Sequence, residues 1–431
     1  MPPSELNAIH IALKASGSEH ATLFTSLIDD HKISFYKRRY PDKRKFGSSN
    51  SDYLVWNTQQ TPAGLRKLSI KKVQEICLRE LPQIHESYNE ALSCFSLPDP
   101  EEDALFTAKV DAGTELINAL TDASSEAAGA VLTFWSSTFE DIVDLDWVPP
   151  DGCLTAKMTT CTLLPKDTLL PLQHSNQGTT LATLAAGSVT WIVWPSTEHN
   201  LGVLEAAYDG FAQDFDYAQL DVTGNLQGGM IFSQKDGQTV RLPPHCPMMA
   251  LATQNSVMVS YTQTTGEDFM STLRKLPLLR AWFQTEIDGA RKQSDFNAFL
   301  IRHLDAMLNG HEDCEEADDM KLTFKTGGPL DMLLRMWDDI KVDLVAILGP
   351  ADHEAVASIW GDFLIEAKGR NCMICKKECR NKLKLMKQHF EDVHWPKATA
   401  PKRIDSMDVD EDSEKMTVED DGDEDDMELE G

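Results

Sequence analysis

The sequence predicts an α+β protein in which one β-rich segment lies between two helical regions, and three observations indicate this. Between 151 and 265, short apolar and β-branched runs alternate with Gly, Pro, Asn and Asp, as in an antiparallel sandwich or barrel. On both sides of that segment, apolar residues recur at helical spacing. Between 369 and 396, cysteines and histidines gather closely enough to indicate a metal site.

The length of 431 residues exceeds one ordinary hydrophobic core, so we expect several folded units. Hydrophobic residues make up 42% of the chain, which is enough to bury cores over most of it. No apolar run reaches the roughly 18 residues that a membrane-spanning helix needs, and no secretory signal is evident. We therefore expect no membrane partner and an intracellular chain with reduced cysteines.

Residues 1–150 are predicted to be mostly helical. Helical spacing of apolar residues predicts helices over 10–28, 65–97, 103–120 and 124–143. Pro82 indicates an interruption or kink, because its ring removes a backbone donor and clashes with the preceding turn. The run Tyr36–Phe46 holds six Lys or Arg residues. It suits a nuclear-import signal or a phosphate contact, and the alternative is a solvated loop on an acidic protein.

The β-rich segment 151–265 contains a hairpin signal at Asp236-Gly237. From 266 to 368 the apolar period becomes that of amphipathic helices. These helices are predicted over 269–287 with a break near Pro277, 295–308, 330–348 and 353–367. The acidic stretch 310–319 between them is predicted to be a solvated loop, since its spacing does not match a calcium-binding loop.

Three motifs within the β-rich segment carry a resemblance. Leu-Pro-Leu-Gln-His-Ser-Asn ends at Asn176, Thr-Trp-Ile-Val-Trp-Pro follows, and Pro-Pro-His-Cys-Pro-Met ends at Met248. Their order resembles the Jumonji-C (JmjC) family over about 100 residues. The resemblance implies a cupin-like double-stranded β-helix flanked by helices. It also implies Fe(II), held by two histidines and one carboxylate, with 2-oxoglutarate and O2 as co-substrates for histone demethylation or protein hydroxylation.

The residues at the corresponding positions depart from that pattern. His174 lies on the first histidine, but Asn176 replaces the acid and Met248 replaces the distal histidine. Val189 lies where the family has the lysine that pairs with 2-oxoglutarate. An amide and a thioether are poor ligands for Fe(II), which prefers imidazole and carboxylate groups. His245, three residues before Met248, is a candidate substitute for the distal histidine.

The C-terminal cluster has the spacing Cys-x2-Cys-x13-His-x4-His, formed by Cys372, Cys375, His389 and His394. Two thiolates from a short turn and two imidazoles from one helix face suit the tetrahedral coordination of Zn(2+). The segment resembles the C2H2 zinc finger family, which implies a small ββα unit. Cys379 takes the place of the family's aromatic residue and is predicted to be a core residue, with replacement of one of the four ligands as the alternative.

Basic residues of the cluster indicate a contact surface. They are Lys376, Lys377, Arg380, Lys382, Lys384 and Lys387. They suit phosphate contacts on DNA, whereas a protein-binding finger and a solvated helix face are the alternatives.

Charge is distributed unevenly around this cluster, although the whole chain has a formal net charge of −29. The segment 366–403 holds 11 Lys and Arg against 4 acids, whereas 404–431 holds 15 acids and one Lys. The acidic body would repel phosphates, which argues against a chain that coats nucleic acid along its length. The segment 397–431 is predicted to be a disordered acidic tail.

The sequence therefore predicts five regions. They are a helical region 1–150, a JmjC-like core 151–265, a second helical region 266–368, a finger 369–396 and a tail 397–431. We expect a chromatin- or transcription-associated binding protein, in the nucleus or otherwise the cytoplasm, without a working iron site. Its partner would be DNA or a chromatin protein. The alternative is an Fe(II)/2-oxoglutarate-dependent demethylase or hydroxylase with an atypical triad.

Overall fold

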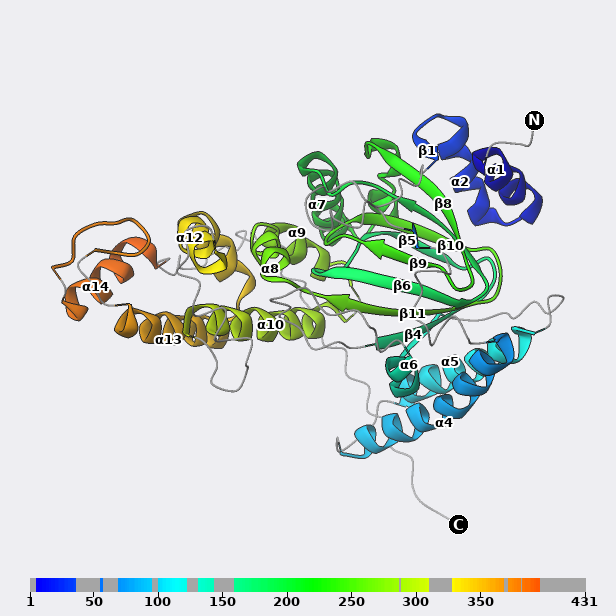
Figure 1. The fold of residues 1–431 in the computed structure, drawn as a ribbon, viewed down its shortest axis with the longest axis horizontal. Coiled ribbons are helices and arrows are strands. Elements are labelled where there is room, and N and C mark those ends of the chain that lie inside the picture. The colour runs from blue at the N-terminus through cyan, green and yellow to red at the C-terminus, as the bar shows by residue number, and fades with distance from the viewer. Residues whose placement is uncertain are drawn as a thin grey trace, which may run out of the picture.

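The computed structural model contains two sheets with helices around them, which confirms the predicted α+β class. The C-terminal helices extend away from the sheets on one side (Figure 1). The structure describes residues 5–35, 55–56, 69–94, 100–121, 131–142, 159–286, 288–309, 328–367, 371–380 and 382–395. The basic run Tyr36–Phe46, the acidic stretch 310–319 and the tail 397–431 lie outside the described residues.

The strands form one sheet in the order β1-β8-β7-β10-β5 and a second in the order β2-β9-β6-β11-β4-β3. From β4 to β11, consecutive strands lie in opposite sheets, except that β7 and β8 are antiparallel neighbours. The strands are β1 (Ile33–Phe35), β2 (Val55–Trp56), β3 (Leu132–Trp135), β4 (Thr159–Leu164), β5 (Leu169–His174), β6 (Thr179–Ala186), β7 (Ser188–Val193), β8 (Gly229–Lys235), β9 (Thr239–Leu242), β10 (Pro247–Ala252) and β11 (Ser256–Gln263).

The inner faces of the two sheets share one apolar core. It includes Leu184, Trp191, Phe232, Val240 and Ala250, which come from β6 to β10. The indole Nε1 of Trp191 donates to Gln234 Oε1 at 2.8 Å, so the buried polar atom of the largest side chain is satisfied. The segment from β4 to β11 is thus a two-layer sandwich, as its alternating strand signals predicted.

Helices cover the outer faces of both sheets. In the five-stranded sheet, Ile192 and Ile231 pack against Phe24 of the N-terminal pair α1 (Glu5–Ser16) and α2 (Glu19–Asp29). In the six-stranded sheet, Cys161 and Val257 pack against α4 (Ile70–Cys94) and α5 (Pro100–Ala119). Figure 1 shows the two helix pairs on opposite sides of the sandwich. Strands β4, β6 and β7 are therefore buried on both faces, which explains their nearly continuous apolar runs.

Three sequence predictions in this region differ in detail from the structure. The segment predicted as a helix over 124–143 contains β3, which pairs antiparallel with β4, followed by the short helix α6 (Ser137–Ile142). Thr, Phe and Trp favour a pleated sheet, and pairing with β4 outweighs the helical spacing. Pro82 lies inside α4 and does not end it. The predicted helix 10–28 is divided at Gly17, whose φ of 67° L-residues rarely adopt.

The C-terminal helices follow the predicted pattern, including the break near Pro277. They are α8 (Gly266–Leu273), α9 (Leu276–Phe283), α10 (Gly289–Asn309), α12 (Pro329–Ile347) and α13 (Pro350–Glu366). α7 (Glu198–Asp214), inserted between β7 and β8, packs against α9 through Leu204 and Leu278. No helix among the described residues is long and apolar enough to cross a bilayer.

Candidate metal centre and the pocket beside His174

The structure brings Cys372, Cys375, His389 and His394 together, and we name these four residues the Cys2His2 group. The two cysteines lie on a tight turn, where the Cys372 N–H donates to the carbonyl of Lys377 at 2.7 Å. His389 ends α14 (Leu383–His389), and His394 ends the π-helical segment Phe390–His394. The wider π turn accommodates the four residues between the histidines and brings both rings to the same side.

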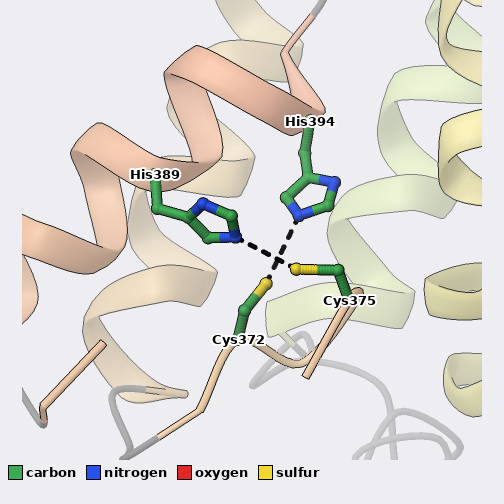
Figure 2. A group of neighbouring side chains, drawn as sticks. All are labelled: Cys372, Cys375, His389 and His394. Atoms are coloured by element: carbon green, nitrogen blue, oxygen red, sulfur yellow. Dashed lines mark hydrogen bonds between the residues drawn. The ribbon is translucent and has the colours of Figure 1, made fainter. Parts of the chain in front are cut away.

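The ligand atoms of the group have the separations of a tetrahedral site. All four lie within 4.8 Å of one another. Cys372 Sγ is 3.5 Å from His394 Nε2, and Cys375 Sγ is 3.1 Å from His389 Nε2 (Figure 2). Bonds of about 2.3 Å to sulfur and about 2.0 Å to nitrogen at tetrahedral angles place these atoms roughly 3.5 Å apart. The group can therefore hold a metal ion.

His394 has a partner that selects its ligand nitrogen. Its Nδ1 lies 2.9 Å and 3.0 Å from the two carboxylate oxygens of Asp338, on α12. Because a carboxylate only accepts, Nδ1 carries the proton, and the Nε2 lone pair faces the sulfur of Cys372. Burial raises the pKa of Asp338, but hydrogen bonds from Lys341 and His394 outweigh it, so the pKa of Asp338 is lowered and the carboxylate stays charged.

His389 differs from His394 in its surroundings. Its Nδ1 is buried without a hydrogen-bond partner among the described residues. Desolvation, followed by the charges of His394 and Lys377, lowers the pKa of His389 and favours the neutral ring that a metal requires. Burial raises the pKa of the Cys372 thiol, and a bound cation reverses this effect because it binds the thiolate.

The segment 371–395 shares the core of the helical region. Cys372, Cys379, Met386 and Phe390 belong to the same apolar cluster as the side chains of α8 to α13. Cys379 is buried, as predicted. Of the two neighbouring apolar residues on α14, Leu385 is 39% exposed, whereas Met386 is buried in this cluster. The hairpin of the expected ββα unit is reduced to a single bridge between Asn371 and Glu378.

Most of the basic side chains of this segment point away from that core. The exposed ones are Lys376, Lys377, Arg380, Lys382 and Lys384, and Lys387 is half-buried. Docking of the segment thus leaves a basic surface, defined by these five exposed residues, open to solvent.

A small pocket lies where β5 meets the helical region, and we name it the His174 pocket. Its volume is about 100 Å³. It is lined by Gln173, His174, Ser175, Asn176, Gln177, Thr180, Leu242, Met248 and Trp282. Met248 on β10 is the register partner of Gln173 on β5, which places it beside His174. The pocket therefore brings together His174, Asn176 and Met248, three positions at which the sequence was compared with the JmjC pattern.

The two histidines near this pocket are buried and neutral. His174 Nδ1 lies 3.2 Å from the Tyr208 hydroxyl, and its ring meets Trp282 edge-on at 5.0 Å. Desolvation and the nearby His245 lower the pKa of His174 to about 3. His245, at a φ of 54°, places Nε2 3.2 Å from Thr272 Oγ1, and desolvation followed by the charge of Lys275 lowers its pKa to about 4.

Two other positions of the JmjC-like pattern, Asn176 and Val189, provide neither a carboxylate nor a positive charge. The Asn176 amide donates to Thr180 at 3.2 Å and to Thr262 at 2.9 Å, so it is engaged by the strands around it. Val189 is fully buried in the sandwich core. His245 lies near His174, with 5.9 Å between ring centroids. Among the described residues, the Cys2His2 group is the one cluster of three or more His, Cys, Asp or Glu side chains placed to hold a metal ion.

Sequence reasoning missed the residues that support both sites. Asp338 and Trp337 lie more than 50 positions before His394. Tyr208 and Trp282, which contact His174, come from α7 and α9. A contact between two helices leaves no spacing signal in the chain, so these residues were not identifiable from the sequence.

Comparison with known proteins adds little. No family model matches the chain. No curated protein matches it. A solved structure of a conserved protein of unknown function from Streptococcus pyogenes is similar to it at 14% identity, covering 31% of this chain and 75% of that chain. Its TM-score is 0.18, so this likeness carries no argument about fold or function.

Proposed function

We propose that the chain is a nuclear, chromatin- or transcription-associated binding protein, built on a JmjC-like sandwich without a working iron site and on a zinc centre. The observation that carries this proposal is the chemistry of the His174 pocket. Asn176 is held by two threonine hydroxyls, Met248 offers a thioether, and His174 alone keeps the ligand type that iron requires.

The strand order supports a double-stranded β-helix. In that fold, two four-stranded sheets face each other and successive strands cross between them. Here β9-β6-β11-β4 faces β8-β7-β10-β5, and β10 pairs with β5 directly beside His174. An iron site of the JmjC type would need its ligands at this same junction.

The residues present do not fit Fe(II) and 2-oxoglutarate. The carboxylate position holds an amide, the distal histidine position holds Met248, and Val189 provides no positive charge for the co-substrate. His245 faces Thr272 through Nε2 and would leave a two-histidine set without an acid. An oxygenase remains the alternative function that the experiment below tests.

Zinc is the proposed ion of the Cys2His2 group, because two thiolates and two imidazoles at tetrahedral separations suit Zn(2+) better than harder ions. The basic surface of the segment supports contact with the phosphates of nucleic acid or with an acidic protein. Clustered Lys and Arg attract both partners.

The test combines metal analysis, turnover and binding on the purified full chain. We expect about one zinc per chain, no iron, no release of succinate from 2-oxoglutarate, and salt-dependent binding to duplex DNA or to reconstituted nucleosomes. Iron that is retained by the wild-type chain and lost in His174→Ala, together with succinate release, would contradict the proposal and establish the oxygenase. A chain that binds neither DNA nor nucleosomes at low salt would contradict the binding function.

Localisation provides an independent check. We expect the full chain to accumulate in the nucleus, and neutralising the basic residues of Tyr36–Phe46 to shift it to the cytoplasm. Exclusion of the wild-type chain from the nucleus would contradict the chromatin-associated role.

A further inference from the structure

One face of α12 contacts the end of the metal-binding segment through three residues. Trp337 Nε1 donates to the carbonyl oxygen of His394 at 2.9 Å. Lys341 Nζ donates to the carbonyl oxygen of Val393 at 2.8 Å and to Asp338 at 2.7 Å. Asp338 in turn accepts from His394 Nδ1. Backbone and side chain of the last ligand are therefore both held by α12.

This contact network reaches the metal centre through the His394 ring. The ring is 0% exposed, and its two nitrogens face Asp338 and the sulfur of Cys372. A carboxylate on the far nitrogen fixes both the tautomer and the plane of a ligand imidazole, and it strengthens the ligand as a donor. His389 has no such partner among the described residues, so this support acts at one ligand of the four.

Aromatic packing places the same segment against α13. Phe390 stacks on Trp360 with 4.7 Å between ring centroids, and Trp360 lies 4.5 Å from Trp337. Trp395 lies 4.8 Å from His353. Phe390 immediately follows His389, so the ring cluster adjoins the ligand set in the chain as well as in space.

We propose that Asp338 is a positioning residue of the metal centre, and that the bound ion holds the 371–395 segment onto α12 and α13. This inference rests on the proposed zinc centre. Metal binding and packing of the segment against α12 and α13 are then thermodynamically coupled, because each favours the same arrangement of His394. The segment is an integral part of the helical region, and its basic surface is oriented by the ion relative to that region.

The experiment measures zinc affinity of the full chain by competition with a chromophoric chelator, in three variants. Asp338→Ala removes the acceptor, whereas Asp338→Asn keeps an oxygen that can accept from His394. Asp339→Asn, an exposed neighbour on the same helix, is the matched control for charge. Removing a carboxylate behind a ligand histidine lowers metal affinity about 10- to 100-fold. Because Asp338 is 41% exposed, we expect about 10-fold for Asp338→Ala, a smaller loss for Asp338→Asn and none for Asp339→Asn.

Two further readouts separate positioning from a merely structural role. In the Co(II)-substituted chain, Asp338→Ala should change the visible absorption bands that report ligand geometry, and Asp339→Asn should not. Removing zinc from the wild-type chain should open Trp337 and Trp360, both buried, to quenching by acrylamide.

Wild-type zinc affinity in Asp338→Ala, or tryptophan quenching unchanged after zinc removal, would overturn the inference while leaving the zinc centre intact. A wild-type chain that binds no zinc would instead overturn the proposed centre itself. Should Asp338→Ala not fold, the isosteric Asp338→Asn carries the affinity test.

Discussion

Two histidines are buried at or beside the His174 pocket and two in the Cys2His2 group, but the two pairs differ in what surrounds the rings. His174 and His245 face hydroxyl groups and an indole edge, and their nearest ionisable neighbours disfavour protonation. His389 and His394 face two thiols, and one of them is backed by a carboxylate. In this protein, the buried histidines that can hold a metal ion are the two that lie beside thiols.

The largest expected effect is the loss of zinc binding when one ligand of the Cys2His2 group is removed. Cys372→Ser should abolish stoichiometric zinc binding, because a neutral hydroxyl replaces a thiolate and structural zinc sites contribute on the order of 10 kcal/mol. The thermal midpoint of the helical region should fall with it. Zinc content is measured by elemental analysis and stability by calorimetry. Cys379→Ala, a buried cysteine beside the group, serves as control and should keep its zinc.

An intermediate effect should come from rebuilding the missing ligands of the His174 pocket. In the double variant Asn176→Asp with Met248→His, both new side chains lie next to His174, at the junction of β5 and β10. If the sandwich is a JmjC-type barrel, Fe(II) binding should rise from none to about one ion per chain, as two imidazoles and a carboxylate form a facial triad. Anaerobic iron titration measures the gain. The same titration on Asn176→Asp alone is the control, and a double variant that stays free of iron would count against the barrel geometry.

The smallest expected effect is a pH dependence of stability that originates in the His174 pocket. The pKa of His174 is lowered from 6.5 to about 3, and that of His245 from 6.5 to about 4. Below about pH 6.5 the unfolded chain therefore binds protons that the folded chain does not, so the free energy of unfolding falls as the pH falls. Each histidine contributes up to about 1.4 kcal/mol per pH unit, until its folded pKa is reached.

Denaturant unfolding between pH 7 and pH 5 measures this slope. In His174→Gln, which keeps a polar side chain, one titrating group is removed and the slope should become shallower. Acid release of zinc affects both chains equally and cancels in the comparison. An identical slope in the two chains would show that His174 is already accessible to protons in the folded state.

The sequence predicted the fold class and the Cys2His2 group because both depend on local spacing. Cys372 and Cys375 lie on one turn and the histidines on one helical segment, so their separation in the chain limits their separation in space. The sandwich was indicated by runs of β-branched residues. The helix predicted over 124–143 failed because the pairing of Leu132 with Leu163 is a contact between distant segments. Asp338 and Tyr208 were missed for the same reason.

The shared core of α12, α13 and the 371–395 segment has a consequence for how the chain folds during synthesis. Trp337 and Trp360 are synthesised before Phe390, whose ring stacks on both of them. Until His394 has also emerged, these two indoles lack part of their cover, and no complete ligand set exists to capture an ion. The packing of the helical region is therefore completed only after the C-terminal segment has been synthesised.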